Sequence, residues 1–207
     1  MNEKLLNVNS EKEKTFNVTV LTVDGTKDYN GKKLEVPKAY PLCKTIGAKG
    51  KVTTGFNTWF FFDQVEISGG IEGVHNFYKS IANDPYKVMI RGVLSKALNP
   101  KESHKRQKKS PATVLSSSGL PLILIDIDDL SLPEGYDSIQ NPEVAIDYFI
   151  DTLPSYFKGV SYSYHLSGSA GFAKNILKAH LFFITSTPHH DDVLRQWANN
   201  DINKSEW

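Results

Sequence analysis

The pattern of hydrophobic and polar positions along the chain predicts strands and helices that alternate. Stretches rich in β-branched or aromatic residues are typical of strands, and here they stand between turns marked by Gly, Pro, Asn and Asp. Other stretches repeat apolar residues at helical spacing. The predicted strands cover residues 15–23, 57–65, 86–93, 121–129, 160–166 and 178–184, and the predicted helices cover residues 71–83, 142–153 and 187–199.

This mixture of elements predicts an α/β or α+β fold whose central sheet is mainly antiparallel and flanked by helices. The helix at 142–153 begins with Asn141 at the N-cap and Pro142 at the first position, and Thr187 with Pro188 marks the start of the last helix in the same way. Residues 1–14 are polar and charged and predict a flexible N-terminus. The predicted apolar face of the helix at 142–153 consists of Val144, Ile146, Phe149 and Ile150.

The strand at 121–129 is the most informative stretch. After Pro121 a continuous apolar run predicts a strand buried on both faces. At its end Asp126 and Asp128 stand two residues apart, so they project from one face with their stems about 6.5 Å apart. Two like charges at that distance require a cation, and Mg²⁺ or Mn²⁺ suits oxygen ligands. The alternative is a strand that ends in an acidic turn.

Composition narrows the class of protein. The chain has 207 residues, of which 40% are hydrophobic and 23% charged, with a net charge of +1, which argues against a histone-like nucleic-acid binder. Its one cysteine, Cys43, excludes a disulfide within the chain and suits a reducing compartment. No stretch resembles a signal peptide or a membrane span. We therefore expect a cytoplasmic protein with no membrane partner.

Positive charge is concentrated in the polar segment 99–111, where the single acid is Glu102. This segment is either a solvated loop or a flap that contacts the phosphates of a nucleotide or of DNA. Arg91 lies inside the preceding predicted strand, where an arginine needs an anionic partner. The basic residues of the segment are Lys101, Lys105, Arg106, Lys108 and Lys109.

Three further motifs each permit two interpretations. The small-residue turn at 167–171 offers unobstructed N–H groups that suit phosphate, although such turns are also common between strands. His180, in an apolar strand, is either a core histidine or a contact for a triphosphate or a metal. The residues at 189–192, His-His-Asp-Asp, resemble a metal cluster, but acids also favour the first turn of a helix.

The order of these parts resembles the archaeo-eukaryotic primase superfamily. More narrowly, it is similar to the primase domains of replication proteins from phages, plasmids and other mobile genetic elements, in which a helicase domain usually follows. The resemblance covers roughly residues 86–197. The stretches that carry it are 88–92 (Val-Met-Ile-Arg-Gly), 125–135 (Ile-Asp-Ile-Asp-Asp-Leu-Ser-Leu-Pro-Glu-Gly) and 166–171 (Leu-Ser-Gly-Ser-Ala-Gly).

The resemblance implies a primase-like catalytic domain over residues 15–207. Residues 15–110 would form its N-terminal α/β part, and residues 111–207 would form the motif-bearing, RRM-like catalytic half. It also implies a DNA-directed nucleotidyltransferase, which uses Mg²⁺ or Mn²⁺ to join NTPs or dNTPs to a 3′-hydroxyl on a single-stranded DNA template. The chain would be a fragment of a longer replication protein, with a helicase domain or subunit as partner.

The resemblance also implies roles for individual residues. Asp126 and Asp128 would be the paired catalytic carboxylates that bind metal, and His180 would contact the phosphates of the incoming nucleotide. Positive charge for the triphosphate would come from Arg91, with looser contributions from the basic segment. The remaining implied contacts are Ser167, Ser169 and Lys178 for the nucleotide, and Lys105, Arg106, Lys108 and Lys109 for DNA or phosphate.

The chain departs from the family pattern at two points. Lys178 stands two residues before His180, where the family has a small residue. The family also has a third acidic residue on a later strand, and no acid after His180 follows an apolar strand residue in that way. We therefore expect the third metal ligand to lie beyond Trp207. The acids considered are Asp191, Asp192, Asp201 and Glu206.

Two other functions compete with the primase interpretation. A module with a degenerate primase fold could bind nucleotides or single-stranded DNA without turnover, as the missing third acid suggests. A rolling-circle initiator nicks DNA through a tyrosine and needs a His-hydrophobic-His motif on a strand. His189 and His190 are adjacent instead, which disfavours the initiator.

Overall fold

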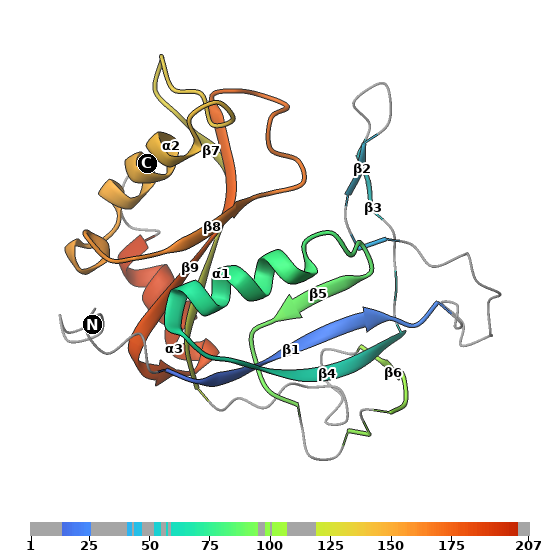
Figure 1. The fold of residues 1–207 in the computed structure, drawn as a ribbon. Helices are drawn as coiled ribbons and strands as arrows, with labels where there is room; N and C mark the ends of the chain where they lie inside the picture. The colour runs from blue at the N-terminus through green and yellow to red at the C-terminus, as the bar shows by residue number, and fades with distance from the viewer. Residues whose placement is uncertain are drawn as a thin grey trace. The chain divides into compact units, whose positions relative to one another are not determined.

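The computed structural model divides the chain into two units, which are described separately (Figure 1). Unit 1 comprises residues 1–14, 68–75 and 119–207, and unit 2 comprises residues 15–67 and 76–118. The residues that the structure describes are 14–25, 41–42, 44–46, 52–54, 57, 59–94, 98–99, 101–106 and 119–202.

Unit 2 contains a four-stranded antiparallel sheet in the order β5-β1-β4-β6. Its strands are β1 (Phe16–Val23), β4 (Trp59–Ile67), β5 (Lys87–Ile90) and β6 (His104–Lys105). Two short strands, β2 (Lys44–Ile46) and β3 (Val52–Thr54), pair with each other in a separate sheet. One buried hydrophobic cluster of unit 2 consists of Leu21, Val23, Phe60, Phe62 and Leu98.

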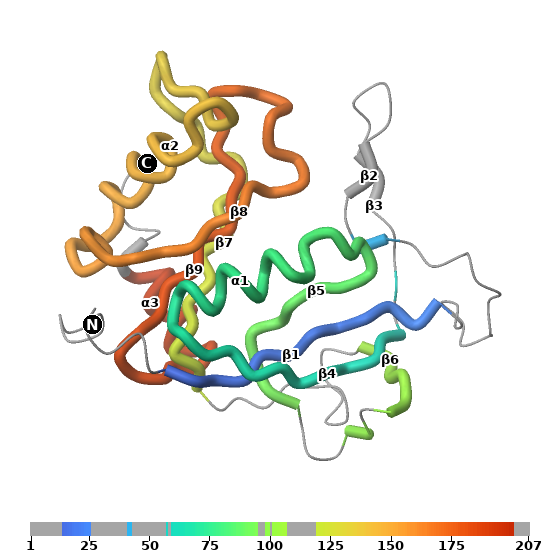
Figure 2. The backbone as a smooth tube through the Cα atoms, in the orientation of Figure 1, coloured from blue at the N-terminus to red at the C-terminus, as the bar shows by residue number. Residues whose placement is uncertain are grey.

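Unit 1 contains a three-stranded antiparallel sheet in the order β7-β9-β8. The long strands β7 and β9 run side by side in the backbone trace of Figure 2, with the shorter β8 on the other edge of β9. The elements from this part of the chain are β7 (Leu120–Ser131), α2 (Pro142–Thr152), β8 (Ser163–Leu166), β9 (Ile176–His189) and α3 (Asp191–Trp197), with a short 3₁₀ helix at Ser155–Phe157 and a π-helical turn at Ala198–Ile202. The remaining helix, α1 (Gly70–Ile81), begins in unit 1 and ends in unit 2.

The structure confirms the α+β class and corrects its sheet arrangement. Every strand pairing described is antiparallel, as predicted. The described strands form three separate sheets, however, whereas the sequence pattern predicted one central sheet. Alternation of apolar residues indicates which face of a strand is buried, but it does not say which strand becomes its neighbour.

The core of unit 1 lies between one face of its sheet and helix α2. Aromatic rings extend this core to α3, since Phe157 stacks on Trp197 with ring centroids 5.4 Å apart and meets Phe183 edge-on at 4.9 Å. The Trp197 indole Nε1 donates a hydrogen bond of 2.6 Å to the Tyr156 hydroxyl. This packing holds the C-terminal helix against the end of the 3₁₀ turn.

Helix α2 begins at Pro142 as predicted, but its buried face differs from the prediction. Val144 is 54% exposed, and Ala145 is fully buried in its place. The buried positions are thus Ala145, Ile146, Phe149 and Ile150, which form one continuous stripe at i, i+1, i+4 and i+5. Val144 lies outside that stripe, and Asn141 makes no side-chain capping hydrogen bond.

The predicted start of the last helix at Thr187 and Pro188 is wrong. Both residues belong to β9, and α3 begins only at Asp191. The pairing of β7 with β9 is irregular here, because its register shifts between the pairs Leu122–Ile184 and Leu120–His189. A proline is tolerated at such an irregularity, since its missing N–H need not interrupt a regular ladder of hydrogen bonds.

Gly119 shows why β7 can begin beside the end of β9. A Cβ atom at this position would lie 3.0 Å from the backbone nitrogen and carbonyl carbon of His189. Backbone atoms cannot move aside as a flexible side chain can, so the two strand ends approach closely only with glycine here.

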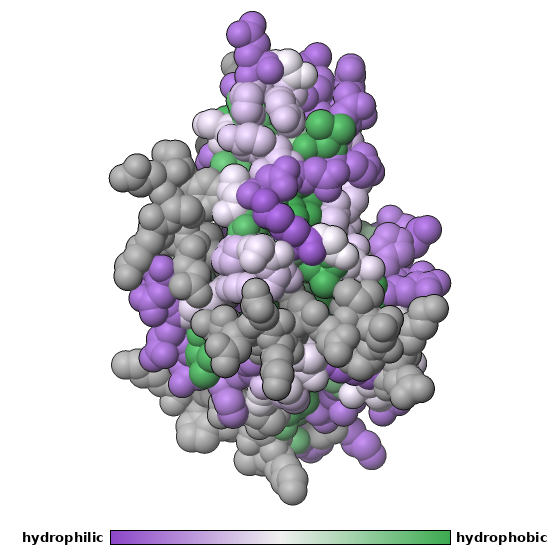
Figure 3. Space-filling view, turned by 90° about the vertical axis from the view of Figure 1, so that its left-hand side faces the viewer, coloured by the Kyte–Doolittle hydropathy of each residue, from purple (hydrophilic) through white to green (hydrophobic). Residues whose placement is uncertain are grey.

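None of the helices in the described part of the chain is long and apolar enough to cross a membrane. On the face drawn in Figure 3, hydrophobic residues form small separate patches among hydrophilic ones. The exposed large hydrophobic residues of unit 1 are Leu124, Ile139, Val144, Phe172 and Val193.

Candidate functional site

Strand β7 carries the two predicted carboxylates on the face of the unit 1 sheet that is turned away from its core. Ile123 and Ile127 point into the core, so Asp126 and Asp128 point the other way by strand alternation. The prediction of a strand buried on both faces is correct only for its first residues, since Leu124 is 42% exposed. The core covers one face of β7 along this part, and the other face is left open for polar chemistry.

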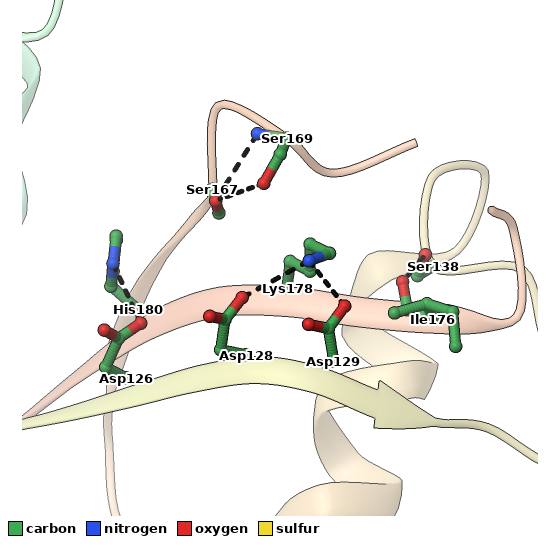
Figure 4. Close-up of polar contacts among 9 residues, drawn as sticks. All are labelled: Asp126, Asp128, Asp129, Ser138, Ser167, Ser169, Ile176, Lys178 and His180. Atoms are coloured by element: carbon green, nitrogen blue, oxygen red, sulfur yellow. Dashed lines mark hydrogen bonds and ion pairs between the residues drawn. The ribbon is translucent and has the colours of Figure 1, made fainter. Parts of the chain in front are cut away.

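Strand register brings Asp126 together with two histidines in one row across the sheet. Asp126 pairs with His180 of β9, and His180 pairs with His165 of β8. The His180 Nε2 atom lies 3.0 Å from Asp126 Oδ1, and the His180 Nδ1 atom lies 3.0 Å from His165 Nε2. Figure 4 shows the first of these contacts, with Asp126 and His180 projecting from neighbouring strands.

The hydrogen bonds of this row determine which nitrogen donates. His165 Nδ1 lies 2.9 Å from the Leu166 carbonyl oxygen, which can only accept, so Nδ1 carries the proton. Burial lowers the pKa of His165, which keeps this ring neutral and leaves its Nε2 as an acceptor. The Nε2 atom of His180 faces the Asp126 carboxylate, and its Nδ1 atom faces the Nε2 atom of His165. The Nε2 atom of His180 is thus held in a position that suits an anionic oxygen.

A β-bulge brings a third acid to the open face. The register advances from Ile127–Ala179 to Leu130–Leu177, so β7 contains one residue more than β9 across this step. The backbone of Asp129 accommodates this extra residue by adopting the left-handed conformation, with φ of 64°. Asp is one of the few residues other than Gly that tolerate this conformation. Asp128 and Asp129 consequently both face the side chain of Lys178.

Lys178 forms ion pairs with both of these carboxylates (Figure 4). Its Nζ atom lies 2.5 Å from Asp129 Oδ1 and 3.3 Å from Asp128 Oδ1. The hydrogen bond to Asp129 raises the pKa of Lys178, and the bond to Asp128 adds to this effect. The lysine side chain is only 18% exposed, while the two carboxylates are 69% and 70% exposed.

The small-residue turn follows β8 directly beside this lysine. The Ser167 backbone N–H donates to the Lys178 carbonyl oxygen at 2.9 Å, and the Ala170 N–H closes the turn on the Ser167 carbonyl at 2.8 Å. The Ser167 and Ser169 hydroxyls lie 3.3 Å apart. A Cβ atom on Gly168 would meet nothing within 4 Å, so the backbone is open to a ligand at that residue.

Unit 1 thus contains all the predicted site residues from Asp126 to His180. The other predictions fall elsewhere. Arg91 belongs to unit 2 and lies just after β5, which ends at Ile90, so it is not inside a strand as predicted. Lys105 and Arg106 also belong to unit 2 and are exposed. Lys108 and Lys109 lie outside the described residues, and the parts that all these basic residues play stay predictions.

Sequence reasoning missed two residues of the site. By strict alternation Asp129 belongs on the opposite face from Asp128, and only the bulge reverses this. The sequence does contain a signal for the bulge. Three of the four residues at the end of the strand are Asp, a residue type that tolerates the left-handed conformation. His165 precedes the small-residue turn by two positions, so alternation would have placed it on the same face as Ser167.

The His-His-Asp-Asp stretch at 189–192 does not form a metal cluster. No group of three or more His, Cys, Asp or Glu side chains is placed to hold a metal within the ranges that the structure describes. Asp191 and Asp192 instead stand in the first turn of α3, where carboxylates favour the helix dipole. Neither acid joins the row on the open face, and the third ligand beyond Trp207 stays a prediction.

The chemistry of the open face nevertheless suits a divalent ion that arrives with a nucleotide. Mg²⁺ is usually bound by one or two protein carboxylates together with waters and substrate phosphates, and a complete protein cage is not needed. Asp126 and Asp128 supply exposed oxygen ligands of this kind. These residues therefore fit Mg²⁺ or Mn²⁺.

Comparisons with models of protein families, with curated proteins and with solved structures found no match to this chain. The candidate site consequently rests on its own geometry and on the motifs in the sequence.

Proposed function

We propose that unit 1 carries the catalytic site of a DNA primase or primase-polymerase domain from a replication protein of a mobile genetic element. The reaction is nucleotidyl transfer from an NTP or dNTP to a 3′-hydroxyl on a single-stranded DNA template, with a helicase domain or subunit as partner. The observation that supports this best is the 3.0 Å contact of His180 with Asp126, because it joins the acidic motif to the histidine motif. In the primase-like fold that we propose, these motifs belong to one nucleotide site.

Each group on the open face has a task in this reaction. Asp126 and Asp128 would hold a divalent ion, which would supply activation of the 3′-hydroxyl and neutralisation of charge on the triphosphate. The Nε2 atom of His180, which contacts Asp126 Oδ1 at 3.0 Å, is shared with a phosphate oxygen when a nucleotide binds. The turn that contains Ser167 and Ser169 offers its backbone N–H groups to the same phosphates.

Primer synthesis on single-stranded DNA with Mg²⁺ or Mn²⁺ tests the proposal. The variant Asp126→Ala/Asp128→Ala should lose at least about a hundredfold in product, because it lacks both carboxylates that place the metal. Asp151→Ala/Glu134→Ala is the matched control, since it removes two exposed acids of unit 1 outside the site. Equal product from both double variants would rule the mechanism out.

A binding module without turnover is the second candidate. It is favoured by the ion pair of Lys178 with Asp128 and by the lack of three grouped metal ligands in the described residues. Titration with ATP, with and without Mn²⁺, separates the two functions. Mn²⁺ should tighten ATP binding at a catalytic site, whereas a degenerate site should bind ATP equally well in both conditions.

A further inference from the structure

Lys178 places its ammonium group between Asp128, one of the two carboxylates of the proposed metal site, and the neighbouring Asp129. It stands two residues before His180 on β9, so both side chains project to the open face. The Nζ atom contacts Asp128 Oδ1 at 3.3 Å and Asp129 Oδ1 at 2.5 Å. One of the two carboxylates proposed to bind metal is therefore already paired with a cation of the chain itself.

The backbone adopts an unfavourable conformation at Asp129 to form this arrangement. Asp129 reaches Lys178 only because the bulge puts it in the left-handed region, at φ of 64°. Bulges often occur beside active sites, where they redirect a side chain, and strained backbone also gathers there. The result is an ammonium anchored by Asp129 and shared with Asp128.

The two basic partners of the site differ in how firmly they are held. His180 is bound on its far side by His165 at 3.0 Å, so its ring cannot turn away from Asp126 without breaking that hydrogen bond. Lys178 carries its charge on a flexible stem with three donors that can be redirected. Lys178 can therefore break its contact with Asp128 when a more highly charged anion, such as a triphosphate, binds nearby.

We infer that Lys178 is a positioning residue that occupies Asp128 until the phosphates of a nucleotide draw its ammonium away. This inference rests on the proposed function and deepens it. A cation 3.3 Å from Asp128 Oδ1 opposes the binding of a second cation there by direct Coulomb repulsion. Transfer of the ammonium to a phosphate removes this repulsion, so nucleotide and metal favour each other's binding, and the coupling is reciprocal.

The test measures Mn²⁺ binding without nucleotide, and ATP binding in EDTA, on the whole chain. Lys178→Met removes the charge and leaves an unbranched side chain that is one atom shorter. Lys174→Met is the matched control, because Lys174 also pairs with an acid of unit 1, Asp137, at 3.7 Å. Electron paramagnetic resonance reports free Mn²⁺, and calorimetry reports ATP.

Lys178→Met should bind Mn²⁺ about three to five times more tightly than the wild type, as expected for the loss of one competing ion pair. It should bind metal-free ATP about three to five times more weakly, because the phosphates lose a cationic partner. Lys174→Met should match the wild type in both assays. Opposite changes confined to Lys178→Met support the inference.

Two other results would overturn it, and they differ from each other. If Lys178→Met binds Mn²⁺ as the wild type does, while Asp126→Ala/Asp128→Ala loses Mn²⁺ binding, the role of Lys178 is refuted and the metal site stands. If Asp126→Ala/Asp128→Ala binds Mn²⁺ as the wild type does, the proposed metal site itself fails and the inference fails with it.

Discussion

Replacing His165 with leucine tests the hydrogen-bonded row across the unit 1 sheet. The substitution removes the hydrogen-bond partner of His180 Nδ1, which lies 3.0 Å away, and the donor to the Leu166 carbonyl. Each of the two hydrogen bonds contributes about 0.5–1.5 kcal/mol, and water replaces part of the contact with His180 because its side chain is 29% exposed. We expect the free energy of unfolding to fall by about 1–2 kcal/mol.

The pH dependence of this effect has a definite sign. Burial lowers the pKa of His165 in the folded protein below its ordinary value near 6.5, so the unfolded chain binds a proton first as the pH falls. The wild type should therefore lose stability below about pH 6.5, until the pH reaches the lower pKa of the folded state. His165→Leu should lack this part of the acid sensitivity.

Two measurements check the prediction. Urea unfolding at pH 8 and pH 5.5 gives the stability difference, and ¹⁵N NMR of the histidine rings reports which nitrogens of His180 carry protons. His75→Leu is the control, since His75 Nδ1 contacts Ser163 Oγ at 3.2 Å outside the row. Unchanged His180 ring signals in His165→Leu would refute the assignment of donors and acceptors.

Three further predictions concern the support of the site. Phe157→Ala should lower the free energy of unfolding by about 3–5 kcal/mol in urea, because Phe157 is 1% exposed, whereas Val144→Ala should change it by less than about 0.5 kcal/mol. Asp129→Val should be less stable than Asp129→Gly by about 1–2 kcal/mol in the same assay, since a β-branched residue is strained at positive φ; equal stabilities would contradict the bulge. Burial and the hydrogen bond to Glu143 raise the pKa of Tyr164 to about 12. Stability should thus fall between about pH 10 and pH 12, where the unfolded chain ionises first, and Tyr164→Phe should reduce this loss in spectrophotometrically monitored unfolding.

Local signals predicted many of the elements well. The strand at 15–23 and the helix at 142–153 appear as β1 (Phe16–Val23) and α2 (Pro142–Thr152), because β-branched alternation and Pro142 act within their own segments. The end of β9 was predicted wrongly because its structure depends on another segment of the chain. Thr187 and Pro188 carry a helix-start signal, but they lie in β9 between its pairs with Leu122 and Leu120 of β7, and these tertiary contacts outweigh the local preference.

The candidate site was likewise predictable from the sequence only in part. Alternation along β7 was enough to place Asp126 and Asp128 on one face, since the side chains of a strand repeat every two residues. The open side of β7 was not predictable, because an apolar run does not reveal that the core of unit 1 covers only one face. Leu124, at 42% exposure, marks the point where that prediction failed.

The sequence by itself determined which strands and helices can form, and which residues supply charge and hydrogen bonds to the open face. Only the tertiary structure decided which of these residues meet. The register of β7, β9 and β8 sets Asp126, His180 and His165 in one row, and a single extra residue at the bulge turns Asp129 toward Lys178. Register and bulges arise from pairing between segments far apart in the chain, so no local pattern of residues contains them.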